Sequence, residues 1–404
     1  MVADPELPAS WRKTFMTLWL GCFMTELNFS MTMPFMALYI ETLHPYGKFE
    51  LNLYAGLAFA VTYLAQAIVS PLWGNLADQK GRKLMCLRAS GVMTFTIFAV
   101  GLVHHAWAIV LLRFVQGAFS GYINNATAFM AGETPHNRSG AVMANMMTAN
   151  VTGNLLGPLV GGLLAGFAGY RVTFFVCGAM MGIVFLLTLF NTKEHFTPIP
   201  AKKMKPMKEI FAQLENKQLI IAMFITTLFI QSALMSIAPI VSLLVKSLMH
   251  GTGNVSFVSG VVAAMPGFGT LLVASRLGVK MDKIGPLKVL VFGLVAAMVV
   301  FLPMYFVTSP WSLGFWRFLL GIANAALLPA VQTVLTVSVP REAFGRIFSY
   351  NQSFQAAGAM LGSMMGSLIS GLFNYQAVFL VTAALMALNL LLIWKVHRPL
   401  ENEK

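Results

Sequence analysis

Runs of about 20 apolar residues recur along nearly the whole chain, and no other feature restricts the possible folds as strongly. The first run, from Thr14 to Ile40, contains a single charged residue, Glu26. Only 10% of the 404 residues are charged, and 57% are hydrophobic. A soluble domain of this length needs more charge than that to cover its surface. The sequence therefore predicts an all-α integral membrane protein.

We expect twelve transmembrane helices in two sets of six, separated by a polar segment. The first set is expected near 14–41, 52–74, 84–105, 107–131, 140–167 and 171–190. The second set is expected near 219–245, 254–278, 286–308, 311–338, 343–371 and 375–396. Residues 191–218 contain six lysines and three prolines, which favours a solvated linker with a surface helix around Met207–Glu215. The predicted domains are an N-terminal bundle (1–190), this linker, and a C-terminal bundle with a short tail (219–404).

Basic residues gather in the loops on one side of the predicted bundle. If both termini and the linker are cytoplasmic, that side holds 22 of the 27 Lys and Arg residues, and the other side holds only Lys48, Arg171 and Lys246. This asymmetry matches the positive-inside rule and fixes both termini in the cytoplasm. It also accounts for the net charge of +13 without a nucleic-acid partner.

The two halves repeat the same short patterns at nearly constant spacing, which predicts a duplicated six-helix unit with pseudo-symmetric bundles. In transporters with such repeats, the substrate site lies between the halves near the middle of the bilayer. The pairs displaced by 204 residues are Gly74 and Gly278, Asp78 and Asp282, Gly81 and Gly285, Arg113 and Arg317, Phe114 and Phe318, and Gly117 and Gly321. The pairs displaced by 205 are Gly153 and Gly358, Gly157 and Gly362, and Gly161 and Gly366.

Three stretches of the first half carry these patterns, and each has a structural as well as a functional interpretation. GNLADQKGRK, Gly74 to Lys83, joins the second and third spans and is either a gate or a basic loop that fixes topology. Arg113, about two turns into the fourth span, is either functional or paired for structural reasons. GNLLGPLVGG, Gly153 to Gly162, has small residues that let helices approach closely, and its proline bends the helix.

The three stretches resemble the major facilitator superfamily, specifically its twelve-span drug:proton antiporters. The loop signature GxLaDrxGrk is matched by Gly74, Leu76, Ala77, Asp78, Gly81, Arg82 and Lys83, with Gln79 in place of the usual arginine. The span-four pattern RxxqG is matched by Arg113, Gln116 and Gly117, with Phe119 where a small residue is usual. The span-five antiporter signature gxxxGPxxGG is matched by Gly153, Gly157, Pro158, Gly161 and Gly162.

This resemblance implies a role for each set of residues. The cytoplasmic gate would comprise Gly74, Asp78, Gly81, Arg82, Lys83 and, in the second half, Asp282. Arg113 would assist proton coupling or stabilise the fourth span near it. The span-five glycines with Pro158 would form a hinge and a seal against leak of the coupling ion. The motifs are only partly kept in the second half, because Pro286 and Leu287 replace the Arg-Lys pair and Ser363 replaces the proline. The resemblance also implies the bacterial cytoplasmic membrane, function as a monomer and no cofactor.

Glu26 is the one acidic residue that the predicted spans place near the middle of the membrane. A carboxylate at that depth is costly, and withdrawal from water favours its protonated form. A group that gains and loses a proton is what a proton-coupled exchanger requires. The alternative is a permanently neutral, hydrogen-bonded glutamate that only ties helices together.

Other polar residues within the spans must point toward neighbouring helices or a cavity, because lipid offers them no partner. Ser30 and Met33 follow Glu26 along one face of the first span, and Asn150 and Asn154 share a face with Pro158. Helix packing and a cavity both remain open for each of them. The cavity candidates are Ser30, Met33, Asn124, Asn150, Asn154, Gln231, Asn324, Gln352 and Gln355.

The predicted function is proton-driven export of small amphipathic compounds across the lipid bilayer, by rocking of two bundles. An uptake symporter or a dedicated metabolite exporter on the same fold is the alternative, and the span-five signature argues against uptake. An enzyme is not expected. Cys22, Cys86 and Cys177 lie far apart, no acid or cysteine has ligand spacing to His104 and His105, and no phosphate-binding GxxxxGK(S/T) loop is present.

Overall fold

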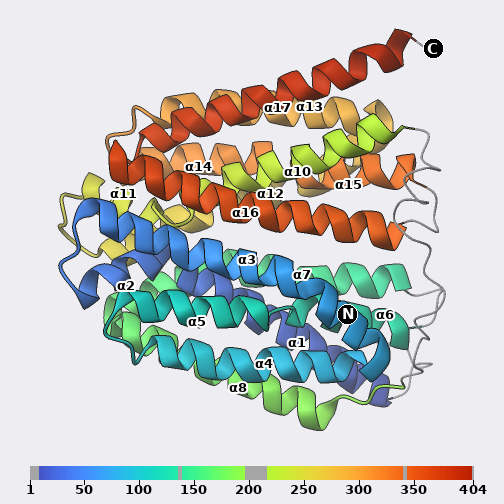
Figure 1. The fold of residues 1–404 in the computed structure, drawn as a ribbon, viewed down its shortest axis with the longest axis horizontal. Helices are drawn as coiled ribbons and strands as arrows, with labels where there is room; N and C mark the ends of the chain where they lie inside the picture. The colour runs from blue at the N-terminus through green and yellow to red at the C-terminus, as the bar shows by residue number, and fades with distance from the viewer. Residues whose placement is uncertain (1–8, 135–138, 196–215, 340–343, 403–404) are drawn as a thin grey trace.

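A computed structural model describes residues 9–134, 139–195, 216–339 and 344–402, and nearly all of these are helical. The expected surface helix around Met207–Glu215, and with it most of the linker, lies outside the described residues. Long helices run side by side along the long axis of the molecule (Figure 1). We call the end that carries the start of the first helix the terminal end, and the opposite end the distal end.

The first half contains eight α-helices and one short 3₁₀-helix, η1, within the described residues. Their bounds are α1 Ala9–Thr32, η1 Met33–Phe35, α2 Met36–Leu43, α3 Lys48–Lys80, α4 Arg82–Val100, α5 Ala106–Ala118, α6 Tyr122–Glu133, α7 Ser139–Ala168 and α8 Tyr170–Asn191. In the second half they are α10 Lys217–Ile237, α11 Val241–Leu248, α12 Val255–Ile284, α13 Pro286–Met304, α14 Pro310–Asn324, α15 Leu327–Ser338, α16 Phe344–Leu372 and α17 Ala377–Asn402.

Ten segments among the described residues are long and apolar enough to cross a membrane. Each corresponds to one of the predicted spans, so the prediction of a helical, multi-pass membrane protein is confirmed. The predicted spans at 14–41 and 343–371 also form helices, α1 to α2 and α16, but are not among the ten. Their Thr, Ser, Asn and Gly residues lower the mean hydropathy of both segments, so apolarity alone does not confirm the count of twelve.

Four of the predicted spans are broken rather than continuous. They are the first, fourth, seventh and tenth, which are interrupted by η1, at 119–121, at 238–240 and at 325–326. Pro34 lies in the first break and Pro239 in the third, where a proline removes a helical hydrogen bond. Gly121 in the second break has a φ of +112°, which favours glycine. The first break and the third are related by the repeat, since the two prolines are 205 residues apart.

Glycines also make the turns after the second and eighth spans. Gly81 and Gly285 have φ values of +92° and +90°, so both turns use a backbone conformation that L side chains avoid. The two glycines are the 204-residue pair found in the sequence. The repeat therefore extends to backbone geometry at the terminal end.

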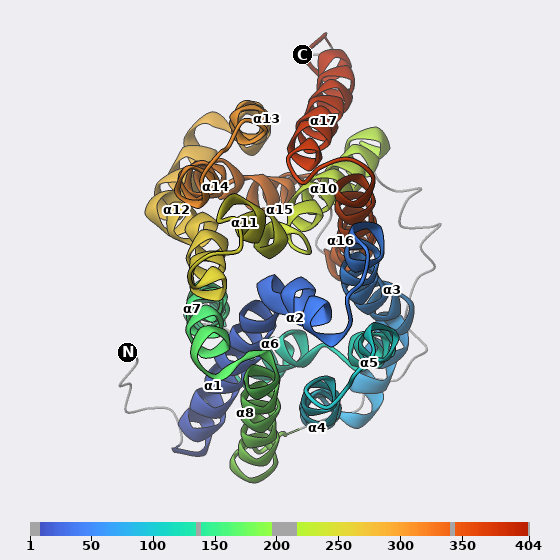
Figure 2. The ribbon, with the colours of Figure 1, turned by 90° about the vertical axis from the view of Figure 1, so that its left-hand side faces the viewer.

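Each half has its own buried apolar core. One core contains residues from Leu18 to Val184, and the other contains residues from Ile220 to Ile393. Leu243 of α11 is the exception, since it packs into the core of the first half. The halves meet along two seams, where α7 lies beside α12 and α3 lies beside α16 (Figure 2).

Candidate functional site

Glu26 lies at the centre of the first pass across the bundle. It is flanked by 17 residues on each side between Ala9, where α1 begins, and Leu43, where α2 ends. The side chain is half-buried, and its Oε1 accepts a hydrogen bond of 2.9 Å from Nδ2 of Asn154 in α7. Among the described residues, no other hydrogen-bond donor contacts this carboxyl group. Its Oε2 therefore remains an acceptor.

Close packing of α1 on α7 makes this hydrogen bond possible. Gly153, Gly157 and Gly161 face α1 so closely that a Cβ on any of them would collide with α1 backbone. The hydroxyl of Ser30 fills the remaining space, donating to the carbonyl oxygen of Gly153 over 3.0 Å and to that of Glu26 over 2.7 Å. The glycines of the span-five signature thus bring Asn154 to Glu26.

The other face of α7 packs on the second half. Gly162 lies against Ser256 and Gly260 of α12, and the carbonyl oxygen of Pro158 lies against Gly260. The side chain of Leu155 packs over Gly267 of the same helix. Asn154 is therefore located between residues that contact α1 and residues that contact α12. The Glu26–Asn154 pair lies next to the seam between the halves.

The second half repeats this packing with different polar groups. Gly358, Gly362 and Gly366 of α16 lie against α10 at Leu228, Ser232 and Ser236, which are 205 residues beyond Phe23, Leu27 and Met31 of the first half. The Ser232 hydroxyl donates to the carbonyl oxygen of Gly358 over 2.9 Å, as that of Ser30 does to Gly153. Helix packing is thus one established role of both glycine triads.

The repeat counterpart of Glu26 is a neutral amide. Gln231 follows Glu26 by 205 residues, and its Oε1 lies 3.5 Å from Nε2 of Gln355, the counterpart of Asn150. In the first half Asn150 does not bind Glu26, and its buried Oδ1 has no hydrogen-bond partner among the described residues. The two halves therefore share a scaffold, but only the first places an acid on it.

Arg113 is buried, with 2% of its surface exposed. Its Nη1 donates to Oε1 of Gln116 over 3.0 Å, while Nε and Nη2 lack a hydrogen-bond partner within the described part of the chain. Its guanidinium lies 5.8 Å from the ring centre of Phe59. The counterpart Arg317 instead donates from Nε to the carbonyl oxygen of Val262 over 3.0 Å.

Tyr63 in α3 is a neighbour of the site that the sequence did not single out. Its hydroxyl lies 3.5 Å from Sδ of Met235 in α10, so it bridges the halves. Its neighbour Thr62 donates to the carbonyl oxygen of Arg113 over 3.1 Å. Spacing alone gave no reason to choose this tyrosine.

The remaining cavity candidates differ in their surroundings. Ser30 is buried in the α1–α7 contact, Gln231 is 9% exposed, and Met33, Asn150, Asn324 and Gln355 are half-buried. Asn124, Asn154 and Gln352 are exposed. The structure thus brings together Glu26 with Asn154 and Gln231 with Gln355, and it leaves Asn124 and Gln352 without a side-chain hydrogen bond to a described residue.

The span-two to span-three motif is held by a residue that the sequence analysis missed. The Glu194 carboxylate accepts from the backbone N–H groups of Arg82 and Lys83, at 2.6 and 2.9 Å, at the N-terminus of α4. A carboxylate is favourable there because of the helix dipole. Lys83 Nζ in turn donates to carbonyl oxygens at the end of α8, those of Leu189 and Thr192. In the second half, Pro286 follows Gly285, the counterpart of Gly81, and has no backbone N–H with which to bind a carboxylate in this way.

Of the other gate candidates, Gly74 has open space where a side chain would lie. The side chains of Asp78 and Asp282 lie outside what the structure describes. Arg82 also reaches Oδ1 of Asn125 from Nη1 over 3.5 Å. The gate assignment therefore stays a prediction.

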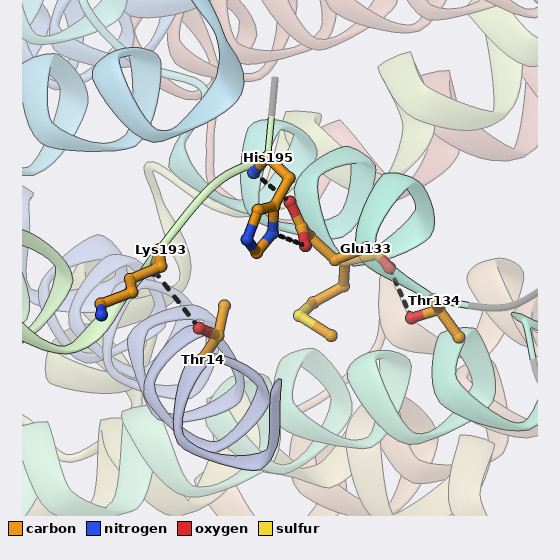
Figure 3. Close-up of polar contacts among 6 residues, drawn as sticks. Thr14, Glu133, Thr134, Lys193 and His195 are labelled. Carbon is orange, nitrogen blue, oxygen red and sulfur yellow. Dashed lines mark hydrogen bonds and ion pairs between the residues drawn. The ribbon is translucent and has the colours of Figure 1, made fainter. Parts of the chain in front are cut away.

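The same terminal end holds a second carboxylate contact to the chain that follows α8 (Figure 3). Glu133, at the end of α6, accepts from the backbone N–H of His195 over 2.6 Å, and its Oε2 lies 3.0 Å from Nδ1 of that residue. The backbone N–H of Lys193 lies 3.4 Å from the hydroxyl of Thr14 in α1. Residues 192–195 are thereby tied to α1, α4 and α6.

Comparison with known proteins agrees with this architecture of two packed, repeated halves, which is typical of membrane transporters. The chain belongs to the major facilitator superfamily, because the family model of that description matches residues 18–278 and 223–404. The multidrug resistance protein MdtG of Citrobacter koseri is 44% identical over 98% of this chain and 98% of its own length. MdtG of Salmonella arizonae is 44% identical over 97% of each chain.

Two solved structures show the same fold at low identity. The nucleoside transporter NupG has a TM-score of 0.75 at 15% identity, covering 95% of this chain and 99% of its own. An inward-facing, unoccupied bacterial homologue of the human lysosomal transporter Spinster has a TM-score of 0.78 at 17% identity, covering 97% and 98%. The prediction of a helical membrane protein with the major facilitator fold is confirmed.

Proposed function

We propose that the chain is a proton-coupled antiporter that exports small amphipathic compounds across the bacterial cytoplasmic membrane by alternating access. The full-length similarity to proteins named for multidrug resistance supports the export of such compounds. The observation that carries the coupling proposal is the position of Glu26 midway along the first pass across the bundle. Its carboxyl group accepts a hydrogen bond from Asn154 of α7, the helix that packs on α1 of the first half and on α12 of the second.

In this proposal Glu26 takes up a proton on one side of the membrane and releases it on the other. An ionised carboxyl group accepts hydrogen bonds through both oxygens, and a protonated one keeps an acceptor for Asn154. Since Oε2 has no bonded donor among the described residues, a proton or a cationic group of the substrate can compete for it. Movement of α7 between α1 and α12 would transmit this exchange to the seam between the halves.

The other residues have supporting roles in the proposal. Arg113, whose Nε and Nη2 have no hydrogen-bond partner among the described residues, assists coupling from the fourth span. Gln231 and Gln355 of the second half supply neutral polar contacts that add to substrate affinity without exchanging protons. Gly74, Asp78, Gly81, Arg82, Lys83 and Asp282 form the cytoplasmic gate. Both termini are cytoplasmic, the two bundles move as the working units, the monomer is functional, and the chain catalyses no chemical reaction.

The coupling proposal is tested with purified protein in liposomes under an imposed proton gradient. Wild type is expected to concentrate candidate drugs, whereas Glu26→Gln should bind them but not accumulate them against a gradient. Gln231→Ala is the matched control, because it alters the repeat-related position without removing a proton site. Concentrative transport by Glu26→Gln would place the coupling group elsewhere.

Compounds of differing charge and size, tested in the same vesicles, separate export of many compounds from export of one. Transport of several unrelated amphipathic compounds supports multidrug export. Transport of a single metabolite, or movement in the same direction as the proton, would instead support the dedicated exporter or the symporter.

A further inference from the structure

We propose that a pseudo-two-fold set of contacts closes the distal end between the two halves, with the Glu41–Lys246 ion pair at its centre. This inference rests on the proposed alternating-access function, in which the distal end must open. It assigns a role to residues that no transporter motif of the sequence contains. The contacts act as a latch, since the halves cannot part at this end while the contacts remain.

Several side-chain contacts between the halves lie together at the distal end. Oε1 of Glu41 in α2 lies 2.7 Å from Nζ of Lys246 in α11. The Lys48 ammonium donates to the carbonyl oxygen of Phe373 over 2.6 Å. The Ser370 hydroxyl donates to Oδ1 of Asn52 over 2.8 Å. The hydroxyls of Tyr170 and Ser256 lie 2.9 Å apart.

These contacts follow the internal repeat of the chain. Glu41 and Lys246 are 205 residues apart, so they occupy equivalent positions of the two halves and meet each other directly. The hydroxyl of Tyr170 bonds Ser256. Their repeat counterparts are Tyr375, 205 residues beyond Tyr170, and Asn52, 204 residues before Ser256, and these two side chains also lie beside each other across the halves. Each half thus presents a tyrosine hydroxyl to the first turns of a helix in the other half.

The opposite charges of Glu41 and Lys246 agree with their equivalent positions in the internal repeat. Where equivalent positions of a duplicated unit face each other, identical charges repel, and one acid with one base attract. Glu26 and Gln231 show the same divergence of a repeated position. The duplication has therefore produced a complementary pair at its axis.

The distribution of basic residues gives independent support. Only Lys48, Arg171 and Lys246 lie on the predicted non-cytoplasmic side, against the strong bias of the other loops. Both lysines contact the opposite half, and Lys48 also lies 5.5 Å from the ring centre of Tyr375. A role in closing the distal end explains why positive charge is present there.

The two types of contact differ in exposure. Asn52 and Ser370 are both 0% exposed, whereas the Glu41 and Lys246 side chains are 35% and 41% exposed. The ion pair lines a cleft of about 400 Å³ together with His250 and Tyr375, so water reaches it. An exposed pair contributes less than a buried hydrogen bond whose loss leaves a polar group unsatisfied. The buried bond therefore contributes most to closure.

The test measures the distance between the halves at the distal end, without substrate. Spin labels at Leu102→Cys and Phe306→Cys report it, because both positions are exposed, lie in distal loops outside the latch and are related by the 204-residue repeat. The native cysteines are buried and need not be removed. Pulsed spin resonance in liposomes then gives the ratio of open to closed distances.

Lys246→Met should raise the open-to-closed ratio about two- to five-fold, and Ser370→Ala about five- to tenfold. Exchange of the charges, Glu41→Lys with Lys246→Glu, should return the ratio toward that of the wild type. Glu50→Gln, which removes an exposed acid at the same end, is the matched control and should leave the ratio unchanged.

The latch is refuted if the single variants keep the wild-type ratio, or if the charge exchange leaves the ratio as high as Lys246→Met does. Failure of the proposed function can be distinguished from failure of the latch, because the proposed function is tested by drug transport in the Glu26→Gln variant and the latch by the distance ratio. A changed distance ratio with normal transport by Glu26→Gln would retain the latch and reject the coupling role of Glu26.

Discussion

Asn154 is the residue that fixes the orientation of the Glu26 carboxyl group. Its amide donates from a helix packed closely on α1, so the carboxyl is held without being fully enclosed. Hydrogen bonds to a charged group contribute about 1.5–3 kcal/mol, which is enough to affect a group that is proposed to exchange a proton.

Replacement of Asn154 by alanine should lower proton-driven transport about tenfold, because the carboxyl loses its only donor among the described residues. The measurement is the initial rate of drug uptake into liposomes at a fixed proton gradient. Asn124→Ala, an exposed amide of α6 without a side-chain hydrogen bond to a described residue, serves as the control. Equal loss in both variants would show that Asn154 has no special role.

At the residue scale the sequence identifies the acid but not its partners. Glu26 is conspicuous because every neighbouring residue from Thr14 to Ile40 is uncharged. Asn154 is one of several amides within the spans, and no pattern distinguishes it. Glu194 was not predicted to cap α4, since its position depends on how the chain returns after α8, which local sequence does not encode.

The contact between α1 and α7 is the element that supports the site. Its close approach depends on glycine at three successive turns, where any side chain would meet α1. Helix interfaces in membranes depend on packing of this kind, because lipid provides no hydrophobic driving force between helices. The span-five signature therefore has a packing role, and the proposed hinge is compatible with it.

Gly157→Ala should destabilise the protein by about 1–3 kcal/mol, because the added methyl group meets the Ser30 hydroxyl and the carbonyl oxygen of Leu27. Thermal unfolding of the purified protein in detergent measures this. Gly132→Ala is the control, since Gly132 lies within α6 with open space at its Cβ position. That variant should be neutral or more stable by up to about 1 kcal/mol. Equal stability of the two variants would contradict the packing role.

Hydropathy predicted where the spans lie but not where they break. The breaks at Pro34, Gly121 and Pro239 lie inside apolar runs, so they leave no trace in a hydropathy profile. A proline or glycine within a transmembrane helix is also often tolerated without a break, because neighbouring groups satisfy the freed backbone. Whether a proline or glycine bends a helix or interrupts it therefore depends on tertiary packing.

At the scale of the whole molecule, duplication is the organising feature. The glycine triads, the arginines, the turns and the distal contacts recur at a displacement of 204 or 205 residues. Among the repeat positions that differ in charge between the halves are Glu26 with Gln231 and Glu41 with Lys246. The first puts the proposed proton site in one half, and the second joins the two halves.

Internal repeats showed the duplication in the sequence, but the contacts between the halves could not be predicted from it. Ser370 and Asn52 are 318 residues apart, and no motif of the sequence pairs them with each other. Only the unexpected lysines of the distal loops hinted at a special role for that end.

Proton movement driven by substrate tests the central claim most directly. A pH-sensitive dye is enclosed in liposomes that contain the protein, and a transported compound is added in excess on one side without an initial proton gradient. The account predicts that protons move opposite to the compound in the wild type and in Gln231→Ala, and that this movement is lost in Glu26→Gln. Proton movement of wild-type size in Glu26→Gln would contradict it.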